Sequence, residues 1–172
     1  MRQSFHDWCI ENNHCNLLDE FYPTKNGILT PHNCSAHTSK VITWQCHRNH
    51  IWKNRIDHRT RGVGCPICAN KRVLAGYNDL ATTNPKLAQE WHPSKNADLL
   101  PSMVTVSSIK KVWWLGRCGH EWQSAISKRN IGRGCPYCAG KKVLPGFNDL
   151  ATKAPQLIQE WDFHKNGCKS QR

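Results

Sequence analysis

Residues 44–68, WQCHRNHIWKNRIDHRTRGVGCPIC, contain the pattern that decides the fold. Cys46 and His50 lie four residues apart, and Cys65 and Cys68 follow a basic segment with the separation found in a zinc knuckle. Two close pairs of cysteine and histidine ligands are the usual set for a tetrahedral structural zinc ion. This stretch therefore predicts a metal site that holds a small domain together.

The same unit occurs twice. Seventy residues further on, residues 114–138 read WLGRCGHEWQSAISKRNIGRGCPYC, aligned without a gap. His120, Cys135 and Cys138 stand at the positions of three of the first unit's ligands. Because self-similarity at a fixed period indicates a repeat architecture, we interpret the chain as two tandem zinc units.

One ligand of the second unit departs from the pattern. Gly116 occupies the position of Cys46, and a cysteine appears two residues later, at Cys118. Cys118 and His120 can reach one metal if the turn between them is tight. With four protein ligands at each site, no coordination position is left for a catalytic water, so zinc-dependent hydrolysis is disfavoured. We expect two zinc ions per chain, one bound by Cys46, His50, Cys65 and Cys68 and one by Cys118, His120, Cys135 and Cys138.

A second repeated element precedes each zinc stretch. Residues 17–26, LLDEFYPTKN, and residues 87–96, LAQEWHPSKN, both place a leucine and an aromatic residue four positions apart, on one face of a helix. A third copy, LIQEWDFHKN, occupies residues 157–166. We expect three short helices that run on to the Lys-Asn pair, with the aromatic packing on a zinc module. The third helix either caps the second module or belongs to a longer array.

Two segments of each unit have the character of strands. Residues 40–44 and 111–114 lead into the zinc loop, and residues 50–56 and 120–126 lead out of it with partial two-residue alternation. These segments predict hairpins with metal ligands at their tips, and hence a small metal-stabilised α+β fold. The predicted domains are residues 1–76, 77–146 and, as a partial third repeat, 147–172.

Composition sets the class of protein. The chain has 172 residues, a net charge of +12 and 38% hydrophobic residues, which suits two small metal-held modules better than one large core. Ten cysteines without an apolar leader at residues 1–13 indicate a reducing compartment, and we expect the cytoplasm. No run approaches the roughly 18 apolar residues of a membrane span, so we expect no membrane partner. The basic balance favours nucleic acid, DNA first.

Basic residues concentrate on the two zinc units. Residues 46–72 hold seven of them against Asp57 alone, and residues 110–142 hold eight against Glu121 alone. Clusters of this kind are typical of surfaces that follow a phosphate backbone. Trp113 is the best candidate for an exposed, base-stacking aromatic. The candidate nucleic-acid-binding residues are Lys53, Arg55, Arg59, Arg61, Lys71, Arg72, Lys110, Lys111, Lys128, Arg129, Arg133, Lys141 and Lys142. The recurring tryptophans, expected in the cores, are Trp44, Trp52, Trp91, Trp114, Trp122 and Trp161.

The motifs CHRNHIW and RGVGCPICANKRVLAGYNDLATTNPKLAQEW, with GHEW and GRGCPYCAGKKVLPGFNDLAT in the second unit, extend over nearly the whole chain. In this combination the chain resembles the tandem "probable zinc-ribbon domain" family of bacteria and large DNA viruses. The resemblance implies a zinc-ribbon or treble-clef-like fold and a nucleic-acid-binding role. Some family members are attached to very-short-patch-repair-like or other restriction-type endonuclease domains.

Three functions remain open at this point. The first is a non-catalytic nucleic-acid-binding repeat, the second a protein-interaction scaffold, and the third the targeting part of an endonuclease system with a nuclease partner. The segment from His47 to His50 is similar to a histidine–asparagine–histidine nuclease signature, but His50 is assigned to zinc. No cluster of carboxylates suits magnesium, so we expect no catalysis by this chain alone. Its oligomeric state is left open.

Overall fold

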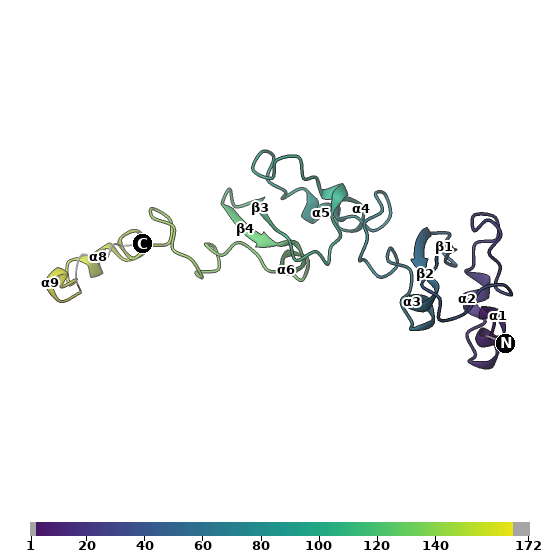
Figure 1. Cartoon of the computed structure of the whole chain (residues 1–172). Helices are drawn as coiled ribbons and strands as arrows, with labels where there is room; N and C mark the ends of the chain where they lie inside the picture. Colours follow the sequence, from purple (N-terminus) through teal and green to yellow (C-terminus); the bar gives the residue numbers. More distant parts are fainter. Residues whose placement is uncertain (1–2, 167–172) are drawn as a thin grey trace. The chain divides into compact units, whose positions relative to one another are not determined.

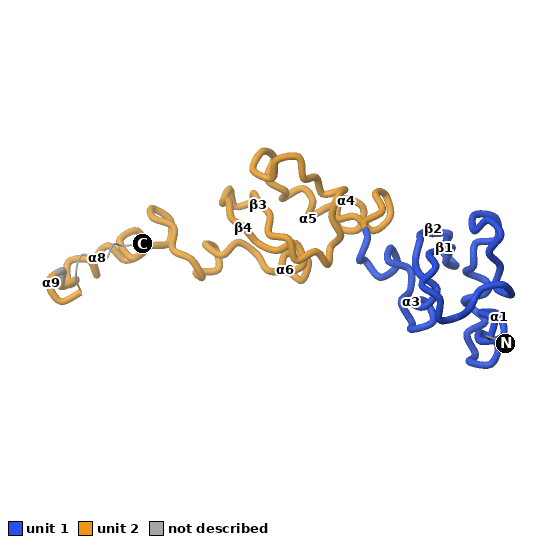
Figure 2. Tube along the Cα trace, viewed as in Figure 1, with its two compact units in different colours: residues 1–72 blue, residues 73–172 orange. Residues whose placement is uncertain are grey.

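The computed structural model describes residues 3–166 and divides the chain into two compact units, residues 1–72 and 73–172 (Figures 1 and 2). The finer division into three repeats stays a prediction. No helix within residues 3–166 has the length and apolar character needed to cross a bilayer. The first unit contains α1 (Phe5–Glu11), α2 (Asn16–Asp19), β1 (Val41–Gln45), β2 (Ile51–Arg55) and α3 (Ile56–Thr60). The second contains α4 (Leu80–Thr83), α5 (Pro85–Ala88), η1 (Pro101–Met103), β3 (Lys111–Leu115), β4 (Glu121–Ala125), α6 (Ile126–Asn130), α7 (Leu150–Lys153), α8 (Pro155–Ile158) and α9 (Phe163–Asn166).

An antiparallel hairpin is the centre of each unit. In β1–β2, Trp44 lies opposite Trp52, and in β3–β4 Trp114 lies opposite Trp122. Aromatic pairs across two strands stabilise such a hairpin, and these four rings are buried. The hairpins predicted from the alternation, and with them the small α+β fold class with two zinc modules, are confirmed.

The predicted helices end earlier than expected. α2 ends at Asp19 and α5 at Ala88, before the aromatic residue. The aromatic residues instead form isolated β-bridges, Phe21 with Trp44 and Trp91 with Trp114. The open edge of a two-stranded sheet presents unpaired backbone groups, and the extended segment satisfies them better than a longer helix would.

The segment that follows each hairpin also differs from the prediction. Ile56 and Ile126 were expected to end strands, but each begins a helix, α3 or α6, and is fully buried. Gly62 follows α3 with φ +87°, a conformation in which glycine commonly ends a helix. This short helix carries an arginine back towards the tryptophans and leads into the second cysteine pair.

The N-terminal segment supplies the same element as α4. Ser4 caps α1 by accepting the Asp7 N–H at 3.1 Å, and the Phe5 N–H donates to the Cys34 carbonyl at 2.7 Å. In the second unit the Leu80 N–H donates to the Val104 carbonyl at 2.8 Å. Phe5 therefore takes the place of Leu80 in the first core.

Candidate metal centres and basic surface

The first site lies at the tip of the β1–β2 hairpin. Cys46 directly follows β1, His50 directly precedes β2, and Cys65 and Cys68 lie on the turn after α3. Their four ligand atoms lie within 4.8 Å of one another. Cys46, His50 and Cys65 are buried, so the hairpin and the second cysteine pair meet at a site shielded from solvent.

The spacing of the ligand atoms fits a tetrahedral zinc ion. His50 Nδ1 lies 3.5, 3.7 and 3.2 Å from the Sγ atoms of Cys46, Cys65 and Cys68. The Sγ atoms of Cys46 and Cys68 are 3.8 Å apart. Zn–S bonds of about 2.3 Å and Zn–N bonds of about 2.0–2.1 Å give tetrahedral edges of about 3.8 Å for S···S and about 3.6 Å for S···N. The chain thus holds a ligand cage of the size zinc requires, with Nδ1 as the histidine donor.

The thiols of this cage influence one another's ionisation. Burial raises the pKa of the Cys46 thiol, but hydrogen bonds from the backbone at Arg48 and His50, together with those from the Cys68 and Cys65 thiols, leave this pKa below its ordinary value. Burial, and then the neighbouring thiols, raise the pKa of Cys68 to about 12. A bound dication removes the repulsion between the thiolates, so zinc binding releases protons at this site.

The second site repeats the cage with one ligand moved. Cys118, His120, Cys135 and Cys138 also place their ligand atoms within 4.8 Å of one another. His120 Nδ1 lies 3.4 and 3.3 Å from the Sγ atoms of Cys135 and Cys138. The structure therefore brings together all eight ligands predicted from the sequence.

The turn at the hairpin tip explains why Cys118 can replace the missing ligand. The Cys46 N–H donates to the His50 carbonyl at 3.1 Å, and the Gly116 N–H donates to the His120 carbonyl at 3.0 Å, so the two five-residue turns match. In the first turn the N–H of its third residue bonds the ligand sulfur. The third position therefore lies beside the cluster of ligand atoms, and in the second turn Cys118 occupies it.

Gly116 is closely packed in this arrangement. A Cβ atom at Gly116 would lie 2.8 Å from the Trp122 ring and 3.2 Å from the Cys118 sulfur. The space of the missing cysteine is therefore partly filled by these two neighbours.

The second cage is more open than the first. Cys118 and Cys138 are exposed, whereas none of the first four ligands is. The His120 ring makes edge contacts with Tyr137 and Phe147, with centroids 5.6 and 4.3 Å away. This aromatic cover could not be predicted from the ligand spacing, because Phe147 lies beyond the cysteine pattern.

Two arginines predicted to contact phosphate are buried instead. The Arg59 guanidinium lies 5.0 and 5.3 Å from the ring centroids of Trp44 and Trp52, forms an ion pair with Glu20, and donates to the Val63 carbonyl at 2.6 Å. Its side chain is only 4% exposed. Burial lowers the pKa of Arg59, and the negative charge of Glu20 opposes this effect.

Arg129 repeats the arrangement. Its guanidinium lies 5.3 and 5.1 Å from the centroids of Trp114 and Trp122 and pairs with Glu90. In both arginines Nε is buried without an acceptor among the described residues, so the Nη atoms and the rings hold the cation. Arg59 and Arg129 are therefore structural, which corrects their prediction as phosphate contacts. Glu20 and Glu90 were missed, although each recurs with its arginine at the same offset of 70 residues.

Two further predicted contacts are engaged within the first unit. Arg55 and Arg61 both pair with Asp57, at 2.7 and 2.6 Å. Trp113, predicted to be exposed, is half-buried with the Lys95 ammonium 4.8 Å from its ring centroid. Trp161, expected in a core, is 39% exposed. The predicted cations that remain exposed outside these pairs are Lys53, Lys71, Arg72, Lys110, Lys111, Lys128, Arg133, Lys141 and Lys142.

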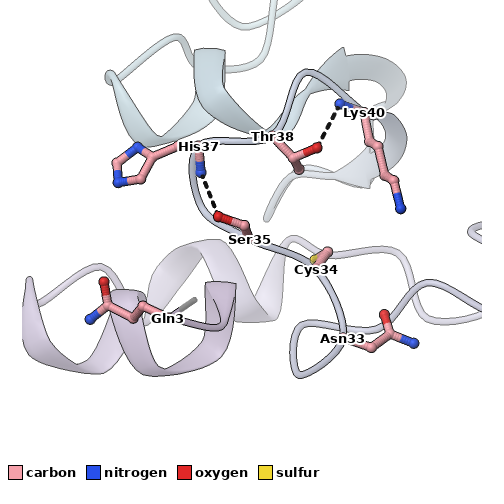
Figure 3. A pocket seen from close by; sticks show the side chains of 7 residues that line it. All are labelled: Gln3, Asn33, Cys34, Ser35, His37, Thr38 and Lys40. Carbon is pink, nitrogen blue, oxygen red and sulfur yellow. Dashed lines mark hydrogen bonds between the residues drawn. The ribbon is translucent and has the colours of Figure 1, made fainter. Parts of the chain in front are cut away.

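A cavity of about 550 Å³ opens in the first unit, away from the metal cage. Figure 3 shows its lining, which comes from Gln3 and the loop of residues 33–40. Ser35 and Thr38 use their hydroxyls within this loop, accepting the N–H groups of His37 and Lys40 at 3.4 and 3.3 Å. Burial raises the pKa of the Cys34 thiol, so it stays protonated at neutral pH. The polar groups of the cavity thus shape the loop.

Comparison with protein families matches residues 17–71 and 87–141 to the family described as "Probable Treble clef zinc finger domain". No curated protein matches the chain. The two matched segments coincide with the two hairpins, their cysteine pairs and the edge segments that precede them. The resemblance noted from the sequence is confirmed, and so is the expectation of two zinc sites. The chain belongs to this treble-clef zinc finger family, of which it carries two tandem copies.

Proposed function

We propose that the chain binds nucleic acid without catalysis. It contacts the phosphates through the open end of the second hairpin, the end opposite the turn that carries the metal ligands. Four exposed cations lie at this end, which we call the basic end: Lys110, Lys111, Lys128 and Arg133. This group of side chains is the observation that carries the proposal. Duplex DNA is the nucleic acid we place first.

Backbone contacts keep the four residues of the basic end together. Lys111 lies opposite Ala125 in the β3–β4 register, and the Ile126 N–H donates to the Lys110 carbonyl at 3.2 Å. The Arg133 N–H donates to the Lys128 carbonyl at 3.1 Å. The cations therefore belong to one folded surface and not to a disordered tail.

Two carboxylates of the second unit, Glu90 and Glu121, are engaged elsewhere. Glu121 lies at the zinc end of the hairpin and pairs with Lys95 and with His92, and Glu90 pairs with Arg129. Among the described residues, no ion pair joins a member of the basic end to a carboxylate. Uncompensated surface cations attract phosphates and release the counterions condensed on nucleic acid.

The first unit lacks this surface. The positions of Lys111, Lys128 and Arg133 are held there by Val41, His58 and Val63. Val41 is 57% exposed and Val63 is 44% exposed. Phosphate binding by the two units is therefore unequal, and the second unit supplies most of the affinity.

The test is binding of the zinc-loaded protein to labelled duplex DNA, measured by fluorescence anisotropy in about 0.1 M salt. Replacing all four residues of the basic end by alanine removes four phosphate contacts and weakens binding on the order of 10²- to 10³-fold. The matched control removes the same charge at exposed lysines elsewhere, through Lys25→Ala, Lys86→Ala, Lys153→Ala and Lys165→Ala. It should change the affinity by less than about threefold.

Equal losses of DNA affinity in the two variants would mean that binding depends on net charge alone, and would overturn the assignment of phosphate binding to the basic end. Absence of binding by the unaltered protein to duplex DNA, single-stranded DNA and RNA would overturn the function itself. That result would favour the protein-interaction alternative. A role as the targeting part of an endonuclease system rests on the family resemblance and needs the same DNA affinity.

A further inference from the structure

Together with the turn and the helix before it, the third copy of the repeated segment up to its tryptophan, residues 146–161, has the backbone of its counterpart in the second module. Asp79 accepts N–H groups from the residues three before and three after it, at 2.6 and 3.0 Å, and Asp149 does the same at 2.6 and 2.9 Å. The residue before the proline has φ −145° and ψ 72° at Asn84, and −146° and 66° at Ala154. The aspartate cap therefore fixes this conformation locally, with or without further packing.

In the second module a hairpin covers this segment. Leu80 and Leu87 are 0% and 7% exposed and belong to the hydrophobic core of the hairpin. Trp91 bridges to Trp114, and the Leu115 N–H donates at 2.9 Å to the backbone carbonyl of the glutamate that directly precedes Trp91. The carboxylate of that glutamate pairs with the arginine held between the two tryptophans.

The first module covers its copy in the same way with different residues. Leu17 is 4% exposed, Phe21 bridges to Trp44, and the Gln45 N–H donates to the Glu20 carbonyl at 2.8 Å. Glu20 again pairs with the arginine between the tryptophans. In both modules, therefore, the segment is covered by a hairpin that carries two cross-strand tryptophans with an arginine between them.

In the third copy the corresponding side chains face solvent. Leu150 is 41% exposed, Leu157 44% and Trp161 39%. Within residues 3–166, Glu160 takes part in no ion pair. An apolar edge with a carboxylate is therefore preformed but uncovered.

We propose that residues 149–161 are a docking edge for a further zinc hairpin, separate from β1–β2 and β3–β4. The hairpin that fits carries two cross-strand tryptophans and an arginine stacked between them. Its first tryptophan bridges to Trp161, its arginine pairs with Glu160, and its apolar face covers Leu150 and Leu157. β1–β2 and β3–β4 already hold their own edge segments, so a second copy of the protein gains nothing by exchanging these hairpins.

The test uses the whole protein with a hairpin supplied at the correct spacing. A copy of residues 97–141 is joined after Asn166, with a specific protease site at the junction. The zinc content should rise from two to three ions per chain. Hydrogen exchange of a peptide covering residues 157–163 should slow at least tenfold, because its backbone pairs with the added hairpin. After cleavage at the junction, the complex and the slow exchange should persist.

Variants of the edge separate docking from simple tethering. Trp161→Ala and Glu160→Arg should each restore fast exchange, whereas Gln159→Ala, at a neighbouring exposed position, should not. A third zinc ion with unchanged exchange at residues 157–163 would overturn the proposal. Failure to bind a third zinc ion would overturn it as well.

Discussion

Arg129→Ala is the change whose outcome separates a structural arginine from one that contacts phosphate. The substitution empties the space between Trp114 and Trp122 and leaves the Glu90 carboxylate without its cation. The side chain of Arg129 is 7% exposed and that of Glu90 is 22% exposed, so the pair is largely, though not fully, desolvated.

The expected loss of stability follows from this burial. Removing one partner of a buried ion pair costs about 3–5 kcal/mol, because the other charge stays buried without compensation. Glu90 keeps some contact with water, which places the cost at the lower end, about 3 kcal/mol. Loss of the cation–π contacts acts in the same direction.

The assay is urea unfolding of the zinc-loaded protein, followed by tryptophan fluorescence. Arg133→Ala, at an exposed arginine of the same unit, is the control and should change stability by no more than about 0.5 kcal/mol. A double-mutant cycle with Glu90→Ala should return a coupling energy of at least about 1 kcal/mol. The structural reasoning is refuted if Arg129→Ala leaves the unfolding midpoint unchanged while DNA affinity falls.

Three further outcomes are expected. A chelator such as a colorimetric zinc indicator should remove one zinc ion well before the other, because Cys118 and Cys138 are exposed; simultaneous release of both ions would contradict this order. Cys118→Ser should leave one zinc ion per chain by elemental analysis, and retention of two would exclude Cys118 as a ligand. Asp79→Ala removes the cap of α4 and should lower the stability of the second unit by about 1–2 kcal/mol. Asp149→Ala should leave the unfolding of the second unit unchanged, because the third copy adds nothing to the hydrophobic core of that unit. Equal effects of the two substitutions would argue against this distinction.

The metal cages are the part of the structure that the sequence predicts best. Ligand spacing and the 70-residue repeat locate Cys65, Cys68 and their counterparts, because zinc imposes its own geometry on whatever chain supplies the ligands. The shift of one metal ligand from the position of Gly116 to Cys118 can also be predicted from the sequence, since only one cysteine lies near that turn.

The fate of the arginines could not be predicted from local sequence. Arg59 lies in a run of basic residues that suggests a solvated surface, yet its partner Glu20 is 39 residues away. The aromatic residues misled in a similar way: Leu17 and Phe21 have helical spacing, but the unpaired edge of the hairpin holds Phe21 in an extended conformation. In both cases a contact between distant segments overrides the local pattern.

The salt dependence of binding tests the proposed function most directly. For the zinc-loaded protein on duplex DNA, four phosphate contacts at the basic end predict that the logarithm of the association constant falls with the logarithm of salt concentration, with a slope of about −3.6. Replacing the four cations by alanine should bring the slope close to zero. A slope near zero for the unaltered protein, or the same slope in both proteins, would contradict phosphate binding by this surface.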